Sequence, residues 1–135
     1  MNNLADPLDT TLFKETENEL GELVPYSVPV TAYPTRSGVI IVNSPGSGEL
    51  KDGRENRWKN LGNHLQEQGL ATLVTYNAPR PDFQVQLEWE PYSYKGVSWN
   101  QLLIESLCHV VDWSLNRGME ICGSQTPDVY LSGFS

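Results

Sequence analysis

The sequence is poor in positive charge and in long apolar runs, and each shortage excludes a class of protein. The 9 lysines and arginines stand against 17 aspartates and glutamates, so the net charge of the 135 residues is −8. A nucleic-acid-binding surface needs a basic patch, and we therefore exclude that class of partner. No stretch has the length of a membrane span, and no basic start precedes an apolar run as in a secretory signal. We expect a cytoplasmic protein with no membrane partner.

Metal-binding and disulfide motifs are also missing. The 2 cysteines, Cys108 and Cys122, have neither the spacing of metal ligands nor that of a disulfide framework. Cys108 falls in a predicted helix and Cys122 in the loop after it. We expect both thiols to be reduced and structural, and we predict no metal site and no cofactor.

Acidic residues are concentrated at the amino end of the chain. Residues 1–22 hold one lysine against a larger set of carboxylates, namely Asp6, Asp9, Glu15, Glu17, Glu19 and Glu22. A segment with charge of one sign and little apolar content does not build a core, so we predict a flexible acidic leader over 1–22. The remaining residues, 23–135, suffice for one domain with a buried core and are too few for two.

Predicted strands follow this leader. Residues 23–33 are β-prone but contain prolines, which favours an edge strand or a hairpin over a central strand. Continuous apolar runs at 38–43 and 70–76 predict strands buried on both faces of a parallel sheet, and 128–131 reads as a third short strand.

Two helices separate these strands. The first is predicted to start near Asp52, with Glu55 completing a capping box, and to stop at Gly69. The second begins at Ser98, with Gln101 in the corresponding position. The alternation of strand and helix predicts an α/β fold of three layers, α/β/α, around a mostly parallel sheet. In such a fold, ligands bind beyond the carboxyl ends of the strands.

Two loops at that edge carry residues suited to acyl transfer. Gly133-Phe134-Ser135 follows the strand at 128–131 and matches the first half of the G-x-S-x-G turn, which holds a serine nucleophile exposed. Pro45-Gly46-Ser47-Gly48 follows the strand at 38–43, where backbone N–H groups can stabilise an oxyanion. An ordinary turn or a phosphate-binding loop would also fit this second segment. Ser135 could equally be a terminal serine without a role.

In the order of its elements and in these two motifs, the segment 24–135 resembles the amino-terminal half of an α/β hydrolase. The likeness is to the dienelactone-hydrolase or esterase-lipase kind, truncated at the nucleophile elbow. It implies that Ser135 is the nucleophile, that the backbone N–H of Ser47 is an oxyanion donor, and that Gly46 and Gly48 shape the binding loop. Pro45 stands where the family's H-G-x-G motif has histidine. The implied substrate is a small ester, thioester or amide, with no cofactor.

The same resemblance predicts that the isolated chain is inactive. The family's catalytic triad places an acid and a histidine after the serine, and neither follows Ser135 here. His64 and His109 precede the serine and fall in predicted helices, where we expect ordinary helix-surface or partly buried imidazoles. The segment Val129–Leu131 would form an open apolar sheet edge, which favours self-association or aggregation.

Two other interpretations of the sequence stay open. One is a non-catalytic α/β module that pairs with another polypeptide through this open edge. The other is a flavodoxin-like domain that binds a small anion at residues 46–48. A basic cluster just after that loop is expected to be a solvated helix face and not an anion site; it comprises Lys51, Arg54, Arg57 and Lys59.

Overall fold

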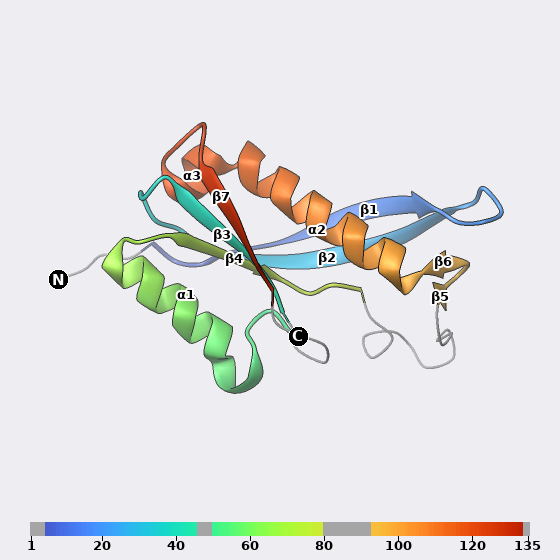
Figure 1. Cartoon of the computed structure of the whole chain (residues 1–135), viewed down its shortest axis with the longest axis horizontal. Helices are drawn as coiled ribbons and strands as arrows, with labels where there is room; N and C mark the ends of the chain where they lie inside the picture. Colours follow the sequence, from blue (N-terminus) through green and yellow to red (C-terminus); the bar gives the residue numbers. More distant parts are fainter. Residues whose placement is uncertain (1–4, 46–49, 80–92, 134–135) are drawn as a thin grey trace.

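A computed structural model describes residues 5–45, 50–79 and 93–133, which form one mixed five-stranded sheet flanked by helices (Figure 1). The sheet has the order β1-β2-β4-β3-β7. Its strands are β1 (Leu8–Glu17), β2 (Leu23–Tyr33), β3 (Val39–Ser44), β4 (Thr72–Tyr76) and β7 (Asp128–Gly133). The other elements are η1 (Arg54–Asn56), α1 (Arg57–Gln68), the short strands β5 (Ser93–Tyr94) and β6 (Val97–Ser98), α2 (Trp99–Asn116) and α3 (Gly118–Cys122).

The central strands are parallel, as the sequence predicts. β3 pairs in parallel with β4 on one side and with β7 on the other. The continuous apolar runs at 38–43 and 70–76 suit this position because both faces of these strands are covered. Ile40 and Val42 face α2 within the main core, and all five residues of β4 are buried.

The other half of the sheet is antiparallel, so the prediction of a mostly parallel sheet is wrong. β1 and β2 form a hairpin in which Leu8 lies opposite Ala32 and Glu17 opposite Leu23. β2 then pairs antiparallel with β4 over Val30–Tyr33. The turn at 18–22 is too short for the crossover that parallel neighbours need, so the two strands it joins must be antiparallel.

β1 lies where the sequence analysis expected a flexible acidic leader. Its residues alternate between the two faces of the sheet: Leu8 and Leu12 pack against the core beneath α2. Asp9, Glu15 and Glu17 occupy the exposed alternate positions. The carboxylates therefore stay in water while the strand pairs, which composition alone did not reveal.

β2 tolerates its prolines because of the direction in which their backbone atoms point. Residues 23–33 form one continuous strand that lies inside the sheet, so the expected edge strand or hairpin over these residues is wrong. The Asn77 N–H donates to the Pro29 carbonyl at 2.9 Å, so the backbone polar atoms of Pro29 face away from β1. Pairing with β4 begins at the next residue, Val30, since Pro29 cannot donate.

The two long helices start differently. At α2 the Ser98 hydroxyl accepts a hydrogen bond from the Gln101 N–H, which confirms the predicted cap. The Gln101 side chain does not complete a capping box, because it donates to Thr16 on β1 at 2.9 Å. The first helix begins at Arg57, so the predicted start near Asp52 with a capping box is wrong. The left-handed conformation of Glu55 (φ 53°) and of its neighbour interrupts the helix there.

α1 and α2 cover opposite faces of the sheet (Figure 1). On one face the side chains of Val30, Ala32 and Val74 pack with those of Leu102 and Val110 from α2. On the other face the Tyr33 ring lies against Gly62 of α1, so closely that a Cβ on that glycine would come within 2.4 Å of the ring.

The two thiols are both free. Cys108 lies on α2, which confirms the helix predicted there, and its side chain is exposed. Cys122 is the last residue of α3 and is buried, although the sequence analysis placed it in a loop. In the part of the chain that the structure describes, no helix is long and apolar enough to cross a membrane.

Candidate active site

The carboxyl ends of the parallel strands bring together the starts of the two predicted loops. In the β3–β7 register, Asn43 lies opposite Ser132 and Ser44 opposite Gly133. Ser44 ends β3 and Gly133 ends β7. The two segments that follow therefore leave the sheet from neighbouring positions, which is the arrangement that acyl transfer requires of a nucleophile turn and an oxyanion loop.

All four predicted site residues lie outside the described part of the chain. These are Gly46, Ser47, Gly48 and Ser135. The roles assigned to them stay predictions. Gly133 is described, and a Cβ added there would meet no atom of the described residues within 4 Å.

A buried amide connects the ends of β3 and β7. The Ser132 hydroxyl donates to Oδ1 of Asn43 at 2.8 Å. Asn43 is 2% exposed, and its Nδ2 has no hydrogen-bond partner among the residues that the structure describes. A buried donor without a partner is costly and is often found at functional sites. Sequence reasoning missed Asn43, although a polar residue at the end of a buried apolar run was a usable signal.

A tyrosine hydroxyl supports the residue before the glycine-rich loop. Tyr76, at the end of β4, donates from its hydroxyl to the Ser44 Oγ at 3.1 Å. Burial raises the pKa of Tyr76, and the hydrogen bond to Ser44 offsets this only in part. The phenol therefore stays protonated at neutral pH, as a donor and not as a nucleophile.

Lys51, in the segment that precedes α1, forms backbone hydrogen bonds to residues at the end of β4. Its N–H donates to Oδ1 of Asn77 at 2.7 Å, and its carbonyl accepts from Thr75 Oγ1 at 2.9 Å. Its ammonium lies 3.6 Å from an Asp9 carboxylate oxygen and 3.7 Å from one of Asp52. Its charge is thus balanced by carboxylates within the protein.

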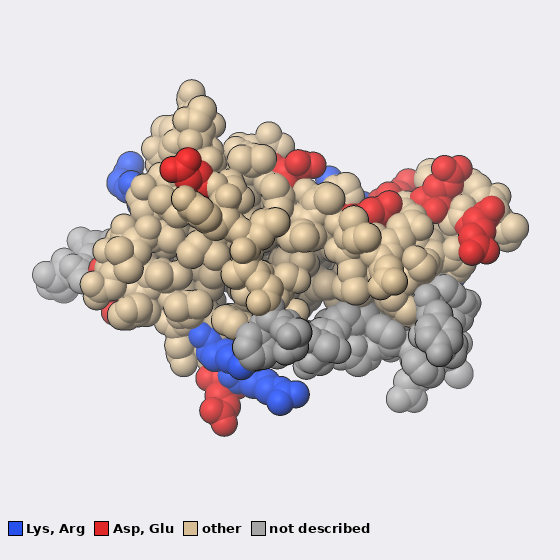
Figure 2. Space-filling view, in the orientation of Figure 1, with Lys and Arg blue, Asp and Glu red and all other residues tan. Residues whose placement is uncertain are grey.

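The basic cluster around η1 is mixed with acidic side chains. Figure 2 shows blue and red atoms side by side at the lower edge of the view, where Figure 1 places η1 and the start of α1. The Arg57 guanidinium lies over the Trp58 ring, 4.8 Å from its centroid. Within the described ranges, no group of three or more His, Cys, Asp or Glu residues could hold a metal ion.

Both histidines lie on helices, as predicted. His64 is an exposed residue of α1. His109 is a partly buried residue of α2, with its ring 6.3 Å from that of Tyr26, centroid to centroid. Neither belongs to the strand ends that carry Ser44 and Gly133.

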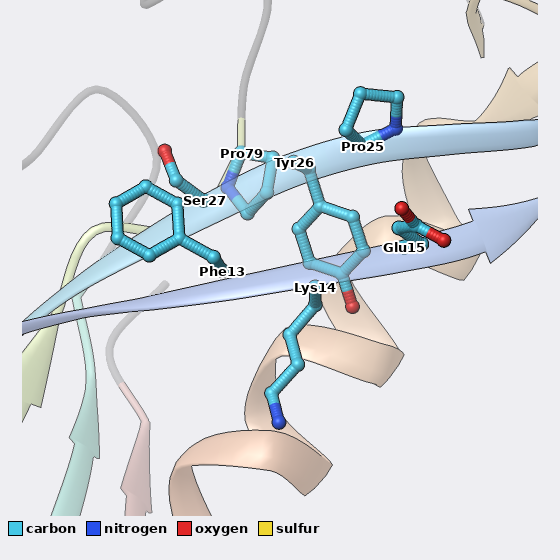
Figure 3. Close-up of a pocket in the computed structure, with 7 residues that line it drawn as sticks. All are labelled: Phe13, Lys14, Glu15, Pro25, Tyr26, Ser27 and Pro79. Carbon is cyan, nitrogen blue, oxygen red and sulfur yellow. The ribbon is translucent and has the colours of Figure 1, made fainter.

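An open cavity of about 680 Å³ lies away from these strand ends, along the β1–β2 hairpin (Figure 3). Phe13 and Lys14 line it from β1, Tyr26 and Ser27 from β2, and Pro79 closes one side. Burial, aided by the charges of neighbouring residues, raises the pKa of Tyr26 to about 12. Its phenol is thus neutral at physiological pH, and we assign this cavity no chemistry.

Comparison with known proteins supports the architecture alone. No protein-family model and no curated protein matches the sequence. A solved structure, homoserine O-acetyltransferase from Staphylococcus aureus, superposes with a TM-score of 0.53 at 15% sequence identity, over 96% of this chain. The fold is α/β-hydrolase-like. The matched region covers only 39% of the acetyltransferase, so this chain spans less than half the length of that enzyme.

Proposed function

We propose that this chain supplies the nucleophile and the oxyanion loop of a serine enzyme that acts on a small ester, thioester or amide. The observation that supports this most is the register that sets Ser44 opposite Gly133, at the starts of the two loops. The similar structure is named as an acetyltransferase, and transfer of an acetyl group is chemistry of the same class. At 15% identity that likeness supports the fold, while the chemistry rests on the two motifs.

The proposed reaction assigns one role to each motif. The Ser135 oxygen attacks the acyl carbon, its proton passes to a base, and the carbonyl electrons move onto the carbonyl oxygen. The backbone N–H of Ser47 stabilises this oxyanion, and Gly46 and Gly48 let the backbone approach the substrate closely. Collapse of the intermediate expels the alcohol, thiol or amine, which takes up the proton. Water then releases the acid from the acyl-serine.

Neither of the described histidines is a candidate for the base in this reaction. His64 is exposed on α1, and His109 packs beside Tyr26 on α2. A serine hydroxyl without a neighbouring base is a weak nucleophile. We therefore expect that residues 1–135 alone do not react with a fluorophosphonate probe above the level of a Ser135→Ala variant, measured by in-gel fluorescence. Strong labelling that Ser135→Ala abolishes would contradict the expected inactivity.

The role of Ser135 itself is tested by adding a base. With p-nitrophenyl acetate and imidazole in solution, acetylation of Ser135 should exceed that of the exposed Ser27 about tenfold, because an oxyanion donor lowers the barrier only at Ser135. Peptide mass spectrometry gives both rates in one sample, so Ser27 serves as the internal control. Equal acetylation of the two serines would contradict the proposed nucleophile, whatever the result with the fluorophosphonate.

A further inference from the structure

β7 forms an edge of the sheet with large apolar side chains in solvent. It pairs with β3 on one side, and in the described part of the chain no strand pairs with its other side. Tyr130 and Leu131 are each 61% exposed, whereas Val129 packs partly against the core. Since neighbouring residues of a strand point to opposite faces, this edge is apolar on both faces.

The backbone of β7 presents unpaired hydrogen-bonding groups at this edge. The Asp128 N–H donates to the Gly38 carbonyl at 3.0 Å, so the polar backbone atoms of Asp128 point toward β3. Those of alternate residues point the opposite way. Val129 and Leu131 therefore direct their N–H and C=O groups outward.

The edge also lacks the features that usually prevent pairing between sheets. Natural edge strands carry lysine, proline or an inward-pointing charge. Residues 128–133 read Asp-Val-Tyr-Leu-Ser-Gly, with Asp128 as the one charge, at the start of the strand. Nothing in this composition opposes the approach of another strand along Val129–Leu131.

We propose that a second copy of this chain pairs antiparallel along β7, with the two-fold axis at Tyr130. In this register Val129 of each copy lies opposite Leu131 of the other copy. Both residues point their backbone groups outward, so each such pair exchanges two N–H···O bonds. The Tyr130 side chains of the two copies meet on the face of α1, and the sheet continues through the dimer.

The side chains select this partner and this register. A two-fold axis brings the same surface of both copies together, so the strand must be complementary to itself. Centred on Tyr130, apolar residues oppose apolar ones, and the Asp128 carboxylate faces the Ser132 hydroxyl and not a second carboxylate. Centred on Leu131, the strand would instead oppose Val129 to Gly133 and Tyr130 to Ser132, which loses these apolar pairs.

Cysteine cross-linking tests the register, in a Cys108→Ser background that removes the exposed native thiol. Opposite residues that exchange no hydrogen bonds lie about 4.5 Å apart at Cα, within the range for a disulfide. Tyr130→Cys should therefore form a disulfide-linked dimer on mild oxidation. Leu131→Cys should form it at least about tenfold more slowly, because its own copy lies diagonally, about 7–8 Å away. Equal rates for the two variants would overturn the register.

Sedimentation equilibrium tests the dimer itself and does not depend on the role of Ser135. The unmodified chain should form dimers, and Leu131→Lys should raise the dissociation constant at least about tenfold, because it places a solvated charge on the pairing edge. Leu23→Lys is the matched control: Leu23 is 66% exposed, on β2, and its replacement should leave the constant unchanged. A monomer at all accessible concentrations, or a dimer indifferent to Leu131→Lys, would overturn the proposal.

Discussion

Asn43 is the residue that most distinguishes the strand ends from the rest of the core. Its side-chain amide is buried and accepts one hydrogen bond from Ser132, while its Nδ2 has no partner within the described part of the chain. A core built for stability alone would place an apolar side chain there. Its presence beside both loops agrees with a site for a polar substrate atom at this edge.

Removing the Ser132 hydroxyl should destabilise the protein. Ser132→Ala removes the hydrogen bond that the buried Asn43 oxygen accepts, and we expect it to lower the free energy of unfolding by about 1 kcal/mol. In an Asn43→Leu background the same change should cost close to nothing, since no buried acceptor is left. Urea unfolding of the unmodified protein, the two single variants and the double variant gives the coupling free energy between Asn43 and Ser132. An equal cost in both backgrounds would show that the hydrogen bond contributes nothing.

Tyr33 makes stability depend on alkaline pH. Burial, together with the charges of Asp52 and Asp9, raises the pKa of Tyr33 to about 12 from its ordinary value of 10.0. A raised pKa means that the folded protein keeps the proton longer. The stabilising effect is therefore complete below pH 10 and is lost as the pH rises toward 12.

The prediction is that Tyr33→Phe loses less stability between pH 8 and pH 11 than the unmodified protein. Urea unfolding at the two pH values measures the difference. Thr11→Val, which replaces an exposed residue of β1 whose side chain does not ionise, controls for general alkaline effects. Identical losses in the Tyr33→Phe variant and the unmodified protein would contradict the assignment.

At the scale of elements, the close contact between α1 and the sheet is made at Gly62. Only a residue without a side chain lets α1 approach the Tyr33 ring this closely. The neighbouring ring atoms would lie 2.4 and 2.6 Å from an added Cβ, far inside van der Waals contact. The helix or the ring would have to shift to accept one.

Gly62→Ala should therefore destabilise the protein by about 2 kcal/mol, because the cost of overpacking exceeds the gain in helix propensity. Glu67→Ala, at an exposed position of the same helix, should change stability by less than about 0.5 kcal/mol. Thermal unfolding compares the two variants. A neutral or stabilising Gly62→Ala would mean that α1 does not sit against Tyr33 as described.

The elements that sequence reasoning predicted correctly are those with strong local signals. The apolar runs of β3 and β4, the left-handed Gly69 that ends α1, and the Ser98 cap of α2 all depend on residues close together in the chain. β1 was missed because its few inward-facing apolar residues, Leu8 and Leu12, are interleaved with acids and threonines, and such a composition is typical of a solvated segment. The start of α1 was missed because backbone geometry at Glu55 overrides an apparent capping box.

For the molecule as a whole, pairing between distant segments decides what local patterns cannot. The antiparallel β1–β2 hairpin makes the sheet mixed instead of parallel. The sequence of a single strand does not indicate the direction in which its neighbours run. The candidate site is predictable in part: the motifs indicate two loops, and their common edge follows from parallel strands. The Asn43–Ser132 hydrogen bond and the support of Ser44 by Tyr76 are visible only once β3, β4 and β7 are assembled.

The most direct test of this account is a disulfide between the last residues of β3 and β7. Ser44 and Gly133 are paired in neighbouring strands and share a face, and the spacing between strands is about 5 Å, within reach of a disulfide. In a Cys108→Ser background, Ser44→Cys with Gly133→Cys should form an intramolecular disulfide on mild oxidation, detected by mass spectrometry of the monomer. The control pair, Ser44→Cys with Asp128→Cys, joins opposite ends of the two strands and should stay reduced. Failure of the first pair to cross-link, or equal cross-linking of both pairs, would contradict the placement of the two loops side by side.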